Sequence, residues 1–176
     1  MYTSSQLQPD LFDTYSMRAQ NLFTFGYEGM DISSFIDRLL QFEVRCVVDV
    51  RDLPLSRKPG FSKGGLSARL NEYGITYVHM SALGCPKNIR DRYRVDGDWA
   101  AYTRDFNAYL SAQASAVQEL TLVARSSTAC LICYEADFTM CHRMFVARAA
   151  HKKGAPAVVH IAAKTAFPDR QAKTAA

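Results

Sequence analysis

Short apolar, β-prone runs alternate with segments of helical periodicity along most of the chain. The runs lie at residues 22–26, 46–50, 75–79, 128–133 and 157–161, and the helical patterns at 32–42, 66–73, 99–123 and 144–151. Strands that alternate with helices form βαβ units, whose right-handed crossovers build a parallel sheet. We therefore predict an α/β fold: a three-layer, Rossmann-like domain with a mainly parallel five-stranded sheet and helices on both faces. The segment at 99–123 fits one long helix or a broken pair, and residues 81–98 read as irregular.

The order of these strands decides which residues meet at one edge of the sheet. Numbered along the chain, an order of 3-2-1-4-5 places Gly26 and Tyr27 beside Cys133 and Tyr134. In an open α/β sheet, ligands bind at the carboxyl ends of the strands, where the strand order reverses. We therefore expect the functional site at this edge.

Composition limits what this site can belong to. The chain has 176 residues, 48% hydrophobic and 22% charged, which suits one soluble globular domain. We assign the domain to residues 22–161, with a flexible polar arm at 1–21 and a polar tail at 162–176. The amino end lacks an export signal, and no segment approaches the roughly 20 apolar residues of a membrane helix. We expect a cytoplasmic protein without membrane contact, in which five cysteines are free thiols or metal ligands rather than disulfides.

The segment at 128–143 joins the fourth strand to the next helix and carries four reactive types of side chain. A carboxylate, a thiol, an imidazole and a guanidinium follow the strand: Glu135, Cys141, His142 and Arg143. A thiol at a helix amino end beside His142 or Arg143 is favoured as thiolate, so Cys141 is a candidate nucleophile. Glu135 and His142 are candidate catalytic partners. His79 ends the third strand at the same edge, where it could act as a general base.

Two other chemistries fit the same segment. Zinc would bind Cys133, Cys141 and a histidine, with Cys85 as a further ligand, but adjacent Cys141 and His142 are expected to strain in reaching one ion. Alternatively, Arg143 and the helix terminus hold a phosphate, Glu135 orients the arginine, and Cys141 is a small buried residue. The sequence requires no cofactor, and zinc is the candidate metal.

A second site segment follows the second strand at residues 49–65. Arg51 and Arg57 lie in a loop rich in glycine and proline, and a planar guanidinium matches phosphate or carboxylate. Together with Arg143, these residues form a candidate substrate-binding set: Gly26, Tyr27, Asp49, Arg51, Arg57, Phe61 and Arg143. The alternative is a solvated loop in which Arg51 pairs with Asp49 or Glu135.

These motifs, taken in order, resemble one known family. They are Gly26-Tyr27, Val48-Asp-Val-Arg51, residues 54–62, residues 74–79, Leu83-Gly84, Cys133-Tyr-Glu135, Cys141-His142-Arg143 and Val159-His160-Ile161. Over residues 23–161 the chain is similar to the domain-of-unknown-function family 488. The resemblance implies an α/β domain whose cysteine and Cys-His-Arg motif are suspected of activity, with an unsettled reaction. Members often have two glycines where this chain has Gly84-Cys85.

Two further features suggest partners. Arginines are interleaved with aromatic residues over residues 90–104, which makes this segment the best candidate nucleic-acid surface: Arg90, Arg92, Tyr93, Arg94, Trp99, Tyr102 and Arg104. Nearby aspartates favour the alternative, a solvated charged loop. In the arm, Gln8, Leu11 and Phe12 resemble the short peptide with which bacterial DNA-processing proteins bind the sliding clamp; the alternative is a Leu-Phe pair packed on the domain.

The sequence therefore predicts a small enzyme that binds a phosphate-bearing substrate, a nucleotide or nucleic acid, with Cys141 as reactive thiol. One alternative is a non-catalytic nucleotide- or DNA-binding module recruited to replication or repair through its arm. The other is a zinc-binding protein.

Overall fold

The computed structural model describes residues 21–170 and contains one six-stranded sheet in the order β3-β2-β4-β1-β5-β6. The strands are β1 (Leu22–Gly26), β2 (Cys46–Asp49), β3 (Thr76–His79), β4 (Ala129–Cys133), β5 (Val158–Ile161) and β6 (Ala166–Pro168). All neighbours are parallel except β5 and β6. The predicted α/β class and mainly parallel sheet are confirmed.

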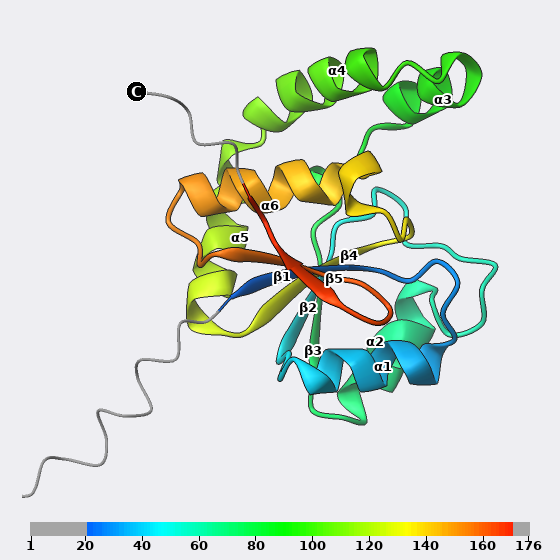
Figure 1. Ribbon diagram of the computed structural model, residues 1–176, viewed down its shortest axis with the longest axis vertical. Helices are drawn as coiled ribbons and strands as arrows, with labels where there is room; N and C mark the ends of the chain where they lie inside the picture. Colours follow the sequence, from blue (N-terminus) through cyan, green and yellow to red (C-terminus); the bar gives the residue numbers. More distant parts are fainter. Residues whose placement is uncertain (1–20, 171–176) are drawn as a thin grey trace, which may run out of the picture.

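Helices cover both faces of the sheet (Figure 1). The helices are α1 (Ile32–Gln41), α2 (Lys63–Asn71), α3 (Lys87–Asp96), α4 (Trp99–Ser111), α5 (Ala114–Ser126) and α6 (His142–Lys152). One apolar cluster joins α1 and α2 to one face, and a second joins α4, α5 and α6 to the other. Because every residue of β1, β2 and β4 is buried, these strands are apolar on both sides, as in covered parallel sheets.

The predicted strand order is wrong at the centre of the sheet. β4 lies between β2 and β1, with Val47 opposite Cys130 on one side and Phe23 opposite Cys130 on the other. Two-sided burial gives β1, β2 and β4 the same continuous apolar pattern, and this pattern does not encode which of them is central. Gly26 still lies opposite Cys133, as expected.

The segment expected to be irregular contains a 3₁₀ turn, η1 (Ser81–Leu83), and helix α3. α3 buries only Ile89, so it shows little apolar periodicity, and it ends at Gly97, whose φ of 64° lies in the left-handed region. Residues 99–123 form the broken pair, α4 and α5, that the sequence allowed. α4 begins at the cap Asp98, whose carboxylate accepts a hydrogen bond from the backbone N–H of Ala101.

The segment after β5 contains a strand where the sequence predicted a polar tail. β6 pairs antiparallel with β5, and the following Asp169 accepts two hydrogen bonds from the Arg148 guanidinium. Three residues are too few to show a strand period. The proposed clamp-binding residues Gln8, Leu11 and Phe12 lie outside the described residues. Among the described helices, none is both long and apolar enough to cross a membrane.

Candidate functional site

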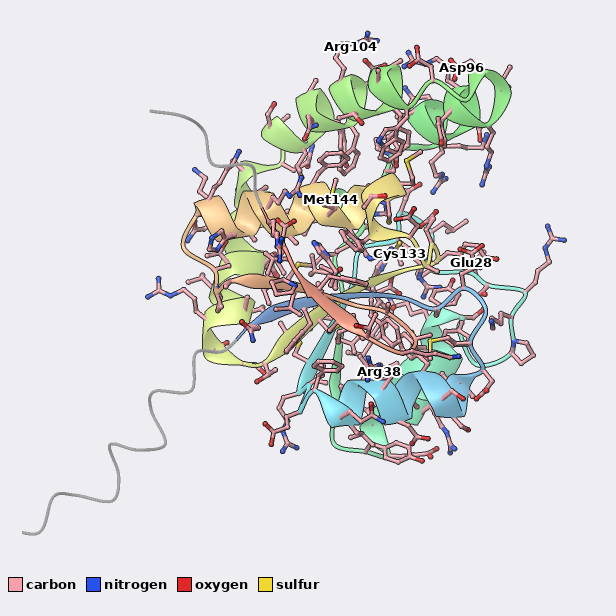
Figure 2. The ribbon with its side chains drawn as sticks, in the orientation of Figure 1. Glu28, Arg38, Asp96, Arg104, Cys133 and Met144 are labelled. Atoms are coloured by element: carbon pink, nitrogen blue, oxygen red, sulfur yellow. The ribbon has the colours of Figure 1, made fainter. Side chains whose placement is uncertain are left out.

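The carboxyl ends of the three central strands meet at one edge of the sheet. β1 ends at Gly26, β2 at Asp49 and β4 at Cys133. After β4 the chain turns through a 3₁₀ segment, η2 (Phe138–Met140), and enters α6 at His142. Figure 2 shows Cys133 at this edge, with the start of α6 above it. The strand ends to which the sequence assigns a site are therefore neighbours.

Two thiols and a carboxylate are in direct contact here. Sγ of Cys133 lies 2.8 Å from Sγ of Cys141, and Oε2 of Glu135 lies 2.7 Å and 3.3 Å from these two sulfur atoms. Each cysteine is 1% exposed, whereas Glu135 is exposed as a residue. Burial raises the pKa of the Cys133 thiol well above its usual value, and the hydrogen bond with Cys141 adds to this. Burial also raises the pKa of Glu135, but hydrogen bonds led by that from Cys133 outweigh it and leave a lowered pKa.

His142 is held in one orientation by the end of β2. Its Nε2 lies 2.8 Å from the carbonyl oxygen of Val50, and its Nδ1 lies 3.8 Å from Sγ of Cys141. Because a carbonyl oxygen only accepts, Nε2 carries a proton, and in the neutral imidazole Nδ1 then presents its lone pair to the thiol. The ring also packs edge-on against Phe106.

The side chains of adjacent Cys141 and His142 lie close together, with Sγ and Nδ1 3.8 Å apart, although the sequence led us to expect strain in bringing both to one ion. Cys141 has extended backbone angles, φ −137° and ψ 140°, and His142 is the first helical residue. This change of backbone conformation brings the two neighbouring side chains to one side. Ligand atoms of Cys133, Glu135, Cys141 and His142 all lie within 4.8 Å of one another.

Arg143 is fully buried behind the thiols. Its Nη1 donates to the carbonyl oxygen of Glu135 and lies 3.3 Å from Sγ of Cys133, and its Nη2 donates to the carbonyl oxygen of Ala136 at 3.1 Å. The sequence assigned the Glu135 carboxylate to orient Arg143, but the backbone carbonyl does so. Among the described residues, no carboxylate forms an ion pair with this guanidinium, and Arg143 does not line the pocket described below.

Arg51 pairs with Asp49, one of the two partners that the sequence left open. Its Nε lies 2.8 Å from Oδ1 of Asp49 and its Nη2 lies 2.5 Å from Oδ2, while Nη1 donates to the hydroxyl of Tyr27 and the carbonyl of Phe61. The Tyr77 hydroxyl donates to Oδ2 of Asp49 at 2.6 Å. Burial lowers the pKa of Arg51, but the hydrogen bond and charge of Asp49 outweigh it and raise the pKa. Most of the guanidinium is therefore committed to internal contacts.

Gly26 and the aromatic rings beside it complete the site on the side of β1. A Cβ on Gly26 would lie 1.8 Å from the carbonyl oxygen of Glu135, so only glycine permits this approach of β1 to the loop after β4. Tyr27 stacks on Phe61 with ring centroids 4.3 Å apart, and Tyr134 meets Tyr27 edge-on at 5.5 Å. Lys58 donates to the carbonyl oxygen of Tyr27 at 3.3 Å.

A pocket of about 710 Å³ opens at this edge of the sheet. Cys133, Glu135 and His142 line it, whereas Cys141 lies behind them. The loop after β2 and the helices α3 and α4 supply most of the remaining wall: Arg51, Asp52, Leu53, Leu55, Ser56, Arg57, Lys58, Cys85, Arg90, Tyr93, Arg94, Trp99 and Tyr102. Five basic side chains and two acidic ones line it in total, so the pocket is basic and rich in aromatic rings.

The arginines expected to form a nucleic-acid surface divide into two groups. Arg90 and Arg94 line the pocket, and Nε of Arg90 is buried without a hydrogen-bond partner. Arg92 and Arg104 instead pair with Asp105, at 2.6 Å and 2.9 Å. Figure 2 shows Arg104 on α4, away from Cys133. The outer part of this segment is therefore the solvated charged surface that the aspartates favoured.

Other predicted site residues differ in their access to the pocket. Arg57 lines it and is exposed, with no interaction to another described side chain. Phe61 is buried beneath Tyr27 and does not line the pocket. His79 lies at the end of β3, where its Nε2 contacts the carbonyl oxygen of Arg51 at 2.8 Å, outside the pocket.

Several pocket residues were not assigned to the site from the sequence. Asp52 pairs with Arg90 at 3.4 Å and links the loop after β2 to α3. Leu53 and Leu55 are exposed at the pocket wall, 60% and 68% respectively. Their signal in the sequence is their place in the loop after β2 with Arg51 and Arg57.

Comparison with known proteins assigns a family. A family model described as a domain of unknown function, DUF488, matches residues 31–150. This range includes the ends of β2 and β4 and the start of α6, and therefore most of the site. No curated protein and no solved structure matches the chain. Because the matched range covers more than half of the sequence, the chain belongs to the DUF488 family.

Proposed function

We propose that this protein is an enzyme that binds a phosphate-bearing substrate, a nucleotide or nucleic acid, and uses Cys141 as its reactive thiol. The observation that carries the proposal is the meeting of two surfaces in one pocket. Basic and aromatic side chains form its walls, and the thiol, carboxylate and imidazole groups form its floor. Pockets of roughly 300–1,000 Å³ with a few convergent polar groups are typical of small-molecule sites.

The walls suit an anion that carries a flat ring. Arg57, in the loop after β2, and Arg94, on α3, both line the pocket, and guanidinium groups form paired hydrogen bonds with phosphate oxygens. Trp99 stacks on Tyr102 with ring centroids 4.7 Å apart, and both line the pocket. Tyr134, which is 47% exposed, also lines it. Aromatic rings of this kind stack on nucleobases of any sequence.

The floor suits nucleophilic chemistry. Oε2 of Glu135, 3.3 Å from Sγ of Cys141, can accept the thiol proton, and Nδ1 of His142 lies 3.8 Å from the same sulfur. The sulfur would form a bond to an electrophilic atom of the substrate, and the leaving group would depart with the electrons of the broken bond. Cys133 lines the pocket and Cys141 does not. The two cysteine side chains must therefore move apart before Cys141 can reach a substrate in the pocket.

Alkylation kinetics test the reactive thiol. Iodoacetamide should modify Cys141 faster than Cys46 near pH 7, measured for each cysteine by peptide mass spectrometry. Glu135→Gln should slow the Cys141 reaction and leave the Cys46 reaction unchanged. A nucleoside monophosphate should protect Cys141, and Arg57→Ala should weaken that protection. Equal rates at Cys141 and Cys46 would end the proposal.

A binding-only module is the second candidate, because both thiols are 1% exposed. In that case nucleotide or single-stranded DNA should raise the melting temperature of the wild-type protein and of Cys141→Ser equally. Arg57→Ala should reduce the shift in both. Arg104→Ala, outside the pocket, is the matched control.

A further inference from the structure

The cluster at the floor of the pocket has the composition of a metal site. Two sulfur atoms, one imidazole nitrogen and one carboxylate oxygen all lie within 4.8 Å of one another, from Cys133, Cys141, His142 and Glu135. Zinc takes sulfur ligands at about 2.3 Å and nitrogen or oxygen ligands at about 2.0–2.2 Å, usually with tetrahedral geometry. Such ligands stand roughly 3.3–3.8 Å apart. Four of the six separations run from 2.7 to 3.8 Å, and all six lie within 4.8 Å. To bind zinc, Sγ of Cys133 must therefore move away from Sγ of Cys141 and from Oε2 of Glu135 by about 1 Å each.

The imidazole is already oriented as a ligand. Nε2 of His142 donates its proton to the carbonyl oxygen of Val50, which leaves the lone pair of Nδ1 directed at Cys141. Metal-binding histidines almost always donate their second ring N–H to a carbonyl or carboxylate in this way, because the contact fixes the ring and the tautomer. A histidine that only fills space in the core does not need its Nδ1 to point at a thiol.

The charges around the cluster balance with a divalent cation in place. Two thiolates and one carboxylate carry three negative charges, so a divalent ion leaves one negative charge. Arg143 supplies the matching positive charge: it is fully buried, its Nη1 lies 3.3 Å from Sγ of Cys133, and no described carboxylate forms an ion pair with it. A buried charge needs such compensation.

We infer that Cys133, Cys141 and His142, with Glu135 as fourth ligand, bind one thiophilic divalent cation of the zinc class. Sulfur and imidazole select this class over Mg²⁺ and Ca²⁺, which prefer oxygen ligands. Cys133, Glu135 and His142 also line the pocket, so the bound ion faces the space that a substrate would occupy. The inference goes beyond the proposed function: Cys141 acts as a free thiol only in the metal-free form.

Cobalt titration of the full chain tests the site. Reduced, metal-free protein should bind one equivalent of Co²⁺ with the near-ultraviolet absorption of a sulfur-to-cobalt charge transfer, and Zn²⁺ should displace it. Cys133→Ser and Cys141→Ser should each lower the affinity by at least about 100-fold. Cys46→Ala, at the start of β2 and outside the pocket, is the matched control and should leave stoichiometry and affinity unchanged. Circular dichroism of each variant checks that it is folded.

Two results would overturn the inference: absence of the charge-transfer band, or unchanged Co²⁺ affinity in folded Cys141→Ser. Alkylation of Cys141 with and without Zn²⁺ separates this inference from the proposed function. Fast alkylation that Zn²⁺ does not slow refutes the metal site and supports the thiol enzyme. If Cys141 is alkylated slowly in the metal-free protein, and that protein binds one Zn²⁺ when the ion is added, the metal site is supported and the reactive thiol is refuted.

Discussion

Replacement of Asp49 by asparagine should destabilise the fold strongly. The Asp49 side chain is 0% exposed and accepts hydrogen bonds from the backbone and guanidinium of Arg51 and from the hydroxyl of Tyr77. Asparagine keeps the shape but removes the charge, and it turns an N–H₂ group toward these donors. Arg51, 8% exposed in its side chain, then has a buried positive charge without a counterion.

The expected loss follows from the burial of this pair. Removing one partner of a buried ion pair costs about 3–5 kcal/mol of the free energy of unfolding. For a domain of this size, each kcal/mol lowers the melting temperature by about 2–4 °C, so the midpoint should fall by roughly 6–20 °C. Urea denaturation followed by far-ultraviolet circular dichroism at pH 7 measures the change.

An exposed ion pair provides the control. Asp91 contacts Lys87 and Arg94 on the surface of α3, where water and salt screen the charges and an ion pair contributes little to stability. Asp91→Asn should therefore change the midpoint little. If Asp49→Asn also lies within about 1 kcal/mol of wild type, the buried pair with Arg51 does not stabilise the fold as argued.

Three further outcomes are expected. Gly26→Ala places a Cβ 1.8 Å from the carbonyl oxygen of Glu135 and should cost about 1–3 kcal/mol in urea denaturation; wild-type stability would show that the loop after β4 yields freely. Burial lowers the pKa of His160, although Asp169 opposes this, so the unfolded chain takes up the proton first. The free energy of unfolding should thus fall as the pH drops below about 6.5, and His160→Gln should remove that decrease; a pH-independent difference between the two proteins would contradict it. Hydrogen peroxide should oxidise Cys133 and Cys141 to a disulfide, with release of two water molecules, because their sulfur atoms are 2.8 Å apart and need only approach to about 2.05 Å; peptide mass spectrometry that finds another pairing would refute this.

The sequence predicted where strands and helices lie along the chain better than it predicted which strands are neighbours in the sheet. The apolar run ending at Cys133 and the helix formers after Arg143 correctly placed a strand-to-helix transition, and with it the carboxylate and thiols at one edge. Strand order failed because central strands share one apolar pattern. Helix α3 was missed because only Ile89 is buried on it, so charge dominates its sequence.

Side-chain partners were harder to predict than positions. Arg51 had two candidate carboxylates, and the choice of Asp49 depends on a turn of the chain only two residues long. The convergence of Cys141 and His142 depends on an extended residue directly before a helix, which residue types alone do not specify. Both contacts arise from backbone angles rather than from composition.

The central position of β4 governs how the chain folds as it is synthesised. β1 and β2 are separated only by α1, yet they cannot pair correctly, because the place between them belongs to residues 129–133. Until those residues leave the ribosome, both strands expose unpaired edges that favour wrong pairing or aggregation. When β4 is inserted, Phe23 pairs with Cys130 across more than a hundred residues. Closing so long a loop costs conformational entropy, and contacts between residues far apart in the sequence slow folding. We therefore expect the amino-terminal half of the nascent chain to be prone to wrong strand pairing until the last third of the domain has been made.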